Sequence, residues 1–123
     1  PTILFAEDSA FFRSQVKEFM EDDGYTVIEA EDGVVAWSLM EEHAPEIAAV
    51  VTDIEMPNMD GFALTEKIRA DDRFSDLPII ALTTLAGEGD VARGKAVGID
   101  DYQIKLDREK LLNTVNHYLR NRQ

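Results

Sequence analysis

Hydrophobic residues gather in short runs, separated by longer segments in which apolar positions recur with helical spacing. The main runs are Thr2–Ala6, Ile47–Thr52, Leu77–Leu82 and, interrupted by polar residues, Ile99–Ile104. Short runs that alternate with helix-length segments are typical of parallel strands buried on both faces. We therefore predict five strands, at about Thr2–Ala6, Thr26–Ala30, Ala48–Thr52, Ile79–Leu82 and Asp101–Ile104.

Amphipathic helices are predicted between these strands. Ser9 is a suitable N-cap for a first helix that runs to about Asp23, and Gly24 suits its C-terminal end. Further helices are predicted after Asp32, after Asp60–Gly61, over Ala86–Gly98 and over Arg108–Arg120. Alternating strands and helices imply right-handed crossovers, with helices on both faces of one sheet, which is the α/β class.

The segment Ala86–Gly98 differs from the other predicted helices because it contains Gly87, Gly89, Gly94 and Gly98. Each glycine inside a helix lowers its stability by about 1 kcal/mol relative to alanine. Two interpretations stay open. The segment is either a short helix with glycine-rich ends, or an element of marginal stability that can shift.

Composition limits the class of protein. The chain has 123 residues, 45% of them hydrophobic, which predicts a single packed domain over residues 1–123. It has no cysteine, which excludes disulfides and thiolate chemistry. No apolar stretch approaches the roughly 18 residues that span a membrane, and no signal peptide is visible, so we expect a cytoplasmic protein that does not enter membranes.

The negative charge is concentrated in the first half of the chain. The net charge is −13, and residues 1–62 contain 15 acidic and 2 basic side chains, whereas residues 63–123 contain 10 of each. Direct nucleic-acid binding is therefore not expected. Most of these acids are explained as a solvated surface.

Five residues at strand ends are candidates for chemistry: Glu7, Asp8, Asp53, Thr83 and Lys105. The carboxyl ends of parallel strands lie along one edge of the sheet, where open α/β sheets bind ligands. Three carboxylates, a hydroxyl and an ammonium at one edge could bind a divalent cation and handle a phosphoryl group. Taken singly, each residue also has a plain structural explanation as a solvated strand end or a helix cap.

Each candidate has a chemical role in such a site. Adjacent acids such as Glu7 and Asp8 repel each other unless a cation is present, and hard oxygen ligands suit Mg²⁺. Asp53 follows the most hydrophobic run, where its carboxylate could attack phosphorus to give an acyl phosphate. The Thr83 hydroxyl could donate to a phosphoryl oxygen, and Lys105 could pair with it as a point charge.

Together these residues resemble the receiver domain of two-component response regulators over essentially the whole chain. The resemblance rests on Ile3–Ser9, on Val51–Pro57 with Met59–Gly61, on Pro78–Thr83 and on Lys105. The intervals of 45, 30 and 22 residues that separate Asp8, Asp53, Thr83 and Lys105 are also similar to those of the family.

The resemblance implies a flavodoxin-like, doubly wound sheet of order 2-1-3-4-5 and a phosphorylation site. Asp53 would accept phosphoryl from the phosphohistidine of a histidine kinase. Asp8 and Asp53 would bind Mg²⁺ with the backbone carbonyl of Glu55, and Glu7 would act through water. Thr83 and Lys105 would contact the phosphoryl group. Tyr102 matches the switch aromatic of the family, although it could also be a half-buried strand residue.

Two positions depart from the family pattern. Leu106 follows Lys105 where proline, often with a cis bond, is usual. The segment Lys105–Glu109 instead resembles receivers fused to chemotaxis histidine kinases or coupling proteins. Glu55 introduces a carboxylate two residues after Asp53, which could tune the lifetime of the phosphoryl group.

We therefore interpret the chain as a signalling switch whose only chemistry is its own phosphorylation and dephosphorylation. Its partners would be a histidine kinase and an output protein or fused domain, docking on the fourth helix, fifth strand and fifth helix. One alternative is a small aspartate-nucleophile phosphatase, which usually has a second aspartate where this chain has Glu55. The other is an adaptor that works without phosphorylation, against which the complete set of site residues argues.

Overall fold

The computed structural model describes residues 1–84, 87–105 and 108–120. Within them, strands and helices alternate strictly along the chain. The strands are β1 (Thr2–Ala6), β2 (Thr26–Ala30), β3 (Ile47–Thr52), β4 (Ile79–Thr83) and β5 (Asp101–Ile104). The helices are α1 (Ala10–Asp22), α2 (Gly33–Glu42), α3 (Gly61–Arg69), α4 (Glu88–Val97) and α5 (Arg108–Arg120).

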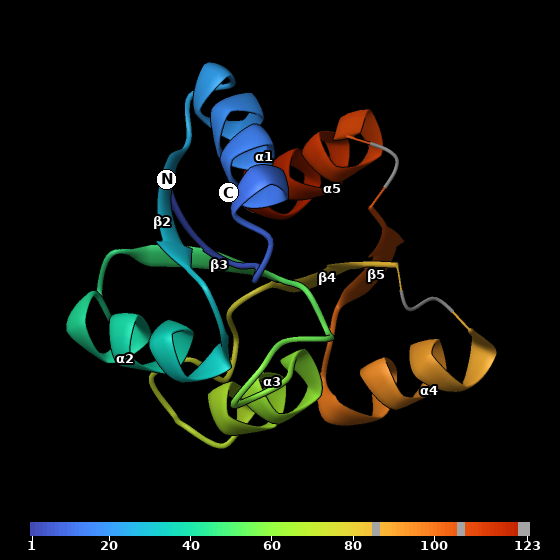
Figure 1. The fold of residues 1–123 in the computed structure, drawn as a ribbon. Coiled ribbons are helices and arrows are strands. Elements are labelled where there is room, and N and C mark those ends of the chain that lie inside the picture. Colours follow the sequence, from blue (N-terminus) through green and yellow to red (C-terminus); the bar gives the residue numbers. More distant parts are fainter. Residues whose placement is uncertain (85–86, 106–107, 121–123) are drawn as a thin grey trace.

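The strands form one parallel sheet in the order β2-β1-β3-β4-β5. Helices α1 and α5 cover one face of this sheet, and α2, α3 and α4 cover the other (Figure 1). The predicted fold, a flavodoxin-like doubly wound sheet of this order, is confirmed. Among the described residues, no helix combines the length and the apolar character needed to cross a membrane.

The hydrophobic core lies in two layers, one on each side of the sheet. In β1, Ile3 and Phe5 belong to the layer under α1 and α5, whereas Leu4 and Ala6 belong to the layer over α2 and α3. All four side chains have no exposed surface. Burial on both faces explains why the central strands have almost continuous apolar sequences.

The element boundaries differ from the predicted ones by about one residue. β3 begins at Ile47 because Ile47 pairs with Thr2, and β4 extends to Thr83 because Thr83 pairs with Ile104. The Ser9 side chain accepts a hydrogen bond from the Phe12 N–H at 3.3 Å, so Ser9 is the predicted N-cap. Gly24, with φ of 96°, follows the end of α1 in the left-handed conformation that glycine favours.

Helix α4 is shorter than the predicted Ala86–Gly98 segment. It ends at Val97, its C-cap Gly98 has a left-handed φ of 107°, and Gly94 is the only buried residue in the helix. The predicted first residue, Ala86, lies outside the described residues. A helix that buries a single glycine has little apolar surface to anchor it.

Candidate functional site

The carboxyl ends of the strands bring the predicted site residues to one edge of the sheet. Backbone hydrogen bonds continue the strand pairing into this edge: Glu7 N–H donates to Ala30 O at 2.9 Å, and Asp53 N–H donates to Ala6 O at 2.8 Å. On the other side, Lys105 N–H donates to Thr83 O at 3.1 Å. The backbone positions of the site are therefore fixed by the sheet.

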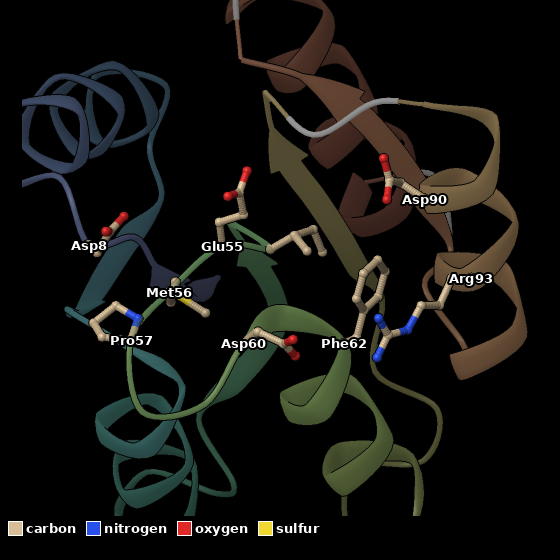
Figure 2. Close-up of a pocket in the computed structure, with 9 residues that line it drawn as sticks. Asp8, Glu55, Met56, Pro57, Asp60, Phe62, Asp90 and Arg93 are labelled. Atoms are coloured by element: carbon tan, nitrogen blue, oxygen red, sulfur yellow. The ribbon is translucent and has the colours of Figure 1, made fainter.

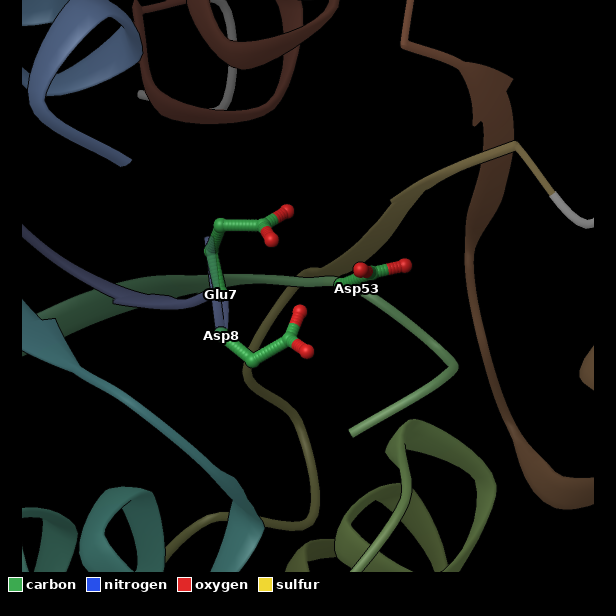
Figure 3. A group of neighbouring side chains, drawn as sticks. All are labelled: Glu7, Asp8 and Asp53. Carbon is green, nitrogen blue, oxygen red and sulfur yellow. The ribbon is translucent and has the colours of Figure 1, made fainter. Parts of the chain in front are cut away.

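Three carboxylates gather at this edge. Glu7, Asp8 and Asp53 each place one oxygen within 4.8 Å of the oxygens of the other two. Figure 3 shows their side chains pointing into one space beyond the ends of β1 and β3. Glu7 has no exposed surface and Asp53 is 4% exposed, whereas Asp8 is open to solvent. Two buried carboxylates and one exposed one form an oxygen donor set that fits a hard cation approaching from solvent.

Lys105 supplies the positive charge that offsets the two buried carboxylates. Its Nζ lies 2.7 Å from Oε1 of Glu7 and 3.0 Å from Oδ2 of Asp53. The second Asp53 oxygen, Oδ1, accepts a hydrogen bond from the Ile54 N–H at 2.7 Å. Both oxygens of Asp53 are thus held in a defined orientation.

Burial sets the protonation of Glu7. Desolvation raises its pKa from 4.5 to about 7, although hydrogen bonds from Lys105 and from the Ser9 N–H oppose this rise. Burial also disfavours the charged form of Lys105, but its contacts with Glu7 and Asp53 outweigh that effect and raise its pKa. The ammonium of Lys105 therefore stays charged beside a glutamate that can exchange a proton near neutral pH.

An open groove extends from Asp8 to Asp90 and Arg93 of α4. It has a volume of about 500 Å³. Acidic, apolar and cationic side chains line it (Figure 2): Asp8, Ile54, Glu55, Met56, Pro57, Asp60, Phe62, Asp90 and Arg93. The Arg93 guanidinium lies 4.4 Å above the ring of Phe62. Asp8, one of the three gathered carboxylates, is thus exposed to solvent in this groove.

Glu55 lies on the rim of this groove. Its side chain is exposed, and it is not one of the three carboxylates that gather at the sheet edge. A role through its backbone carbonyl, as the resemblance implies, stays a prediction.

Thr83 and Tyr102 come from neighbouring strands. Thr83 ends β4 and has no exposed surface. Tyr102 in β5 pairs with Ala81 and is half-buried, with its ring against Gly94 of α4. Burial, followed by the charges of Asp90, Asp53 and Glu55, raises the pKa of Tyr102 to about 12. The bond between Lys105 and Leu106 lies outside the described residues.

Residues at the start of α1 make contacts in the site that we did not predict from the sequence. The Arg13 guanidinium donates to Glu7 O at 2.6 Å, and the Ser9 N–H donates to Oε2 of Glu7 at 2.8 Å. The ring of Phe12 lies over the Lys105 ammonium. The only sequence signal for these residues was their place in the first turn after the adjacent acids.

A parallel sheet of order 2-1-3-4-5 with three acids and a lysine at its carboxyl edge agrees with the resemblance of the sequence to receiver domains. Residues 3–116 match the response regulator receiver domain family, and the chain belongs to this family. Receiver domains are signalling switches in two-component systems rather than enzymes that turn over an external substrate.

Several similar proteins are chemotaxis proteins. The chain is 38% identical to chemotaxis protein CheY1 of Helicobacter pylori strain J99 over 104 residues, which cover 84% of this chain and 83% of the relative. Its structure is similar to chemotaxis protein CheY4 of Vibrio cholerae, with a TM-score of 0.89, 30% identity, and 96% and 98% of the two chains covered. It is also similar to the Borrelia burgdorferi CheX–CheY–BeF3–Mg²⁺ complex, with a TM-score of 0.86, 31% identity, and 94% and 86% covered. The chain is thus a CheY-like receiver domain.

Proposed function

We propose that this chain accepts a phosphoryl group on Asp53 from the phosphohistidine of a histidine kinase. The observation that supports this most is the shared contact of Lys105 with Glu7 and Asp53, which holds the buried Asp53 carboxylate beside Asp8 at the carboxyl edge of the sheet. An Asp53 oxygen would attack phosphorus, forming an O–P bond as the P–N bond to the histidine breaks. The released imidazole would keep the bonding electrons and take up a proton from solvent.

The acidic cluster would hold the metal ion for this reaction. Asp8 and Asp53 would bind Mg²⁺ directly together with the backbone carbonyl of Glu55, and Glu7 would contact it through water. When bound, Mg²⁺ would neutralise charge on the transferred phosphoryl oxygens. The similar Borrelia burgdorferi CheY was solved with BeF3 and Mg²⁺, which supports this assignment.

Lys105 and Thr83 would recognise the product. Once Asp53 is modified, the Lys105 ammonium would pair with a phosphoryl oxygen, and the Thr83 hydroxyl would donate to another. Charge-assisted hydrogen bonds of this kind are stronger than neutral ones. They would favour the state in which Thr83 has moved toward Asp53.

The switch would pass from Thr83 to Tyr102 and α4. Movement of Thr83 would open space for the Tyr102 ring to turn inward, and the weakly anchored α4 would follow. The α4–β5–α5 face would then change for a protein partner or a fused output domain. This is a population shift, so the phosphoryl group need only bind one of the two states better.

We infer that residues 1–123 act as one receiver domain in the cytoplasm, without binding nucleic acid or membranes. Glu55 is exposed and is not a member of the carboxylate cluster, which gives no support to the phosphatase alternative, since that reaction needs a general acid near Asp53.

Two experiments test the proposed function. Phos-tag gels after treatment with acetyl phosphate and Mg²⁺ should show a shifted band for the wild type and none for Asp53→Asn.

The second experiment measures hydrogen exchange with and without beryllofluoride. Beryllofluoride should change the exchange rates over residues 84–104 in the wild type, and much less in Thr83→Ala. No change in the wild type, or a full change in Thr83→Ala, would refute the route of the switch.

A further inference from the structure

An aromatic ring covers the ammonium of Lys105. Nζ of Lys105 lies 4.7 Å from the ring centroid of Phe12, within the range in which a cation is attracted to an aromatic face. The Lys105 side chain is only 15% exposed. Glu7, Asp53 and the ring of Phe12 therefore surround the ammonium with two negative charges and one aromatic face.

The position of Phe12 is fixed by the first turn of α1. Its N–H donates to the Ser9 Oγ at 3.3 Å, and the Ser9 N–H donates to Oε2 of Glu7 at 2.8 Å. The ring packs against the core layer that contains Val16. Phe12 is thus connected to the site from its backbone and from its side chain.

Phe11, the preceding residue, has a different environment. Its side chain is 74% exposed, and no ring contact with a cation is found for it among the described residues. Two adjacent phenylalanines therefore differ in whether they face Lys105, so the chain contains its own control.

We propose that Phe12 is a positioning residue for phosphoryl transfer, whose ring keeps the ammonium of Lys105 at the site while the charges around it change. Lysine has a flexible stem and a strongly hydrated charge, so an ammonium at a sheet edge tends to move into water. Glu7 and Asp53 hold it before the reaction, but Mg²⁺ and the phosphoryl group alter both carboxylates. The attraction of the ring does not depend on those charges.

This proposal rests on the proposed function and makes a separate prediction. The ring lies over Lys105, which is not one of the residues that would bind the metal. Its loss should therefore slow phosphorylation while the affinity for Mg²⁺ stays nearly unchanged. A purely structural loss of packing would not separate the two quantities.

The experiment compares Phe12→Leu, Phe12→Tyr and the control Phe11→Leu in the full chain. The rate of phosphorylation by acetyl phosphate at saturating Mg²⁺ is followed on Phos-tag gels, and the Mg²⁺ dissociation constant is measured by calorimetry. Phe12→Leu should lower the rate roughly threefold to tenfold, whereas Phe12→Tyr and Phe11→Leu should stay within about twofold of the wild type. All three variants should bind Mg²⁺ within about twofold of the wild type.

A second measurement needs no variant. In the wild type, NMR should show the terminal methylene protons of Lys105 shifted upfield by the Phe12 ring. Unshifted protons would overturn the proposal. If the wild type is phosphorylated, an equal rate of phosphorylation in Phe12→Leu would overturn it as well. A wild type that is never phosphorylated would refute the proposed function itself, and this proposal with it.

Discussion

Nζ of Lys105 lies 2.7 Å from Oε1 of Glu7, a carboxylate that has no exposed surface. Glu7 follows β1 and Lys105 follows β5, so this contact joins two strands that are separated by β3 and β4 in the sheet. It places a proton-exchanging acid and a fixed cation beside Asp53.

The raised pKa of Glu7 predicts a pH dependence of stability. Since this pKa is about 7 in the folded state rather than 4.5, the folded protein holds a proton that the unfolded chain releases between those values. The metal-free protein should therefore lose stability as the pH rises through this range, and Glu7→Gln should remove that contribution. Urea titrations of both proteins at about pH 5 and about pH 8 measure the difference. An identical pH dependence in the two proteins would contradict the assignment.

Crowded carboxylates should destabilise the metal-free protein. Asp8→Asn or Asp53→Ala removes one of the three negative charges, while Lys105 keeps Glu7 as a partner. The melting temperature of each variant should be roughly 3–6 °C higher than that of the wild type, which corresponds to about 1 kcal/mol in the free energy of unfolding. Neither variant should be phosphorylated. Asp76→Asn, which changes an exposed acid in the loop after α3, is the control for net charge. Lower melting temperatures for both site variants would argue against destabilising repulsion between the carboxylates.

Mg²⁺ should bind with modest affinity, because only Asp8, Asp53 and one carbonyl are expected as direct ligands and the ion keeps several waters. Asp8→Asn should weaken binding by about tenfold or more, since it removes the carboxylate that faces solvent. NMR titration with MgCl2, followed at residues 7, 8, 53 and 55, gives the dissociation constants, with Asp76→Asn again as the control. Equal affinities for Asp8→Asn and the wild type would exclude Asp8 as a ligand.

Gly94 should control the position of Tyr102. A Cβ atom at Gly94 would lie 2.9 Å from Cδ2 of Tyr102, so Gly94→Ala requires the ring and α4 to move apart. Gly89→Ala is the matched control in the same helix, because a Cβ there meets nothing within 4 Å. Gly89→Ala should stabilise α4 by up to about 1 kcal/mol. In NMR spectra of the unphosphorylated protein, Gly94→Ala should shift the ring signals of Tyr102. Unchanged Tyr102 signals in Gly94→Ala would show that this contact does not set the ring position.

The fold could be predicted from the sequence because its strands are buried on both faces. The apolar runs around Leu4 and Val50 leave few alternatives to a parallel sheet, and the strand ends then place Glu7, Asp53 and Lys105 at one edge. Local capping signals such as Ser9 located the start of α1 within a residue.

Contacts between distant elements could not be predicted in the same way. The position of Phe12 over Lys105 depends on how α1 packs beside the end of β5, which the spacing of residues along the chain does not reveal. The high pKa of Glu7 follows from complete burial, which a glutamate in a sequence does not reveal. Gly94 in α4 is explained by its contact with Tyr102, and Gly98 after the helix is explained by its left-handed backbone. The number of glycines in the segment does not reveal these separate roles.

Chemical trapping shows whether Asp53 is the phosphoryl acceptor. The chain is phosphorylated with acetyl phosphate and Mg²⁺, reduced with borohydride, digested and analysed by mass spectrometry. Borohydride converts an acyl phosphate to an alcohol, so we expect homoserine at position 53 and a modification that hydroxylamine removes. A hydroxylamine-stable phosphate on Ser9, Thr52 or Thr83, or no modification at all, would contradict this expectation.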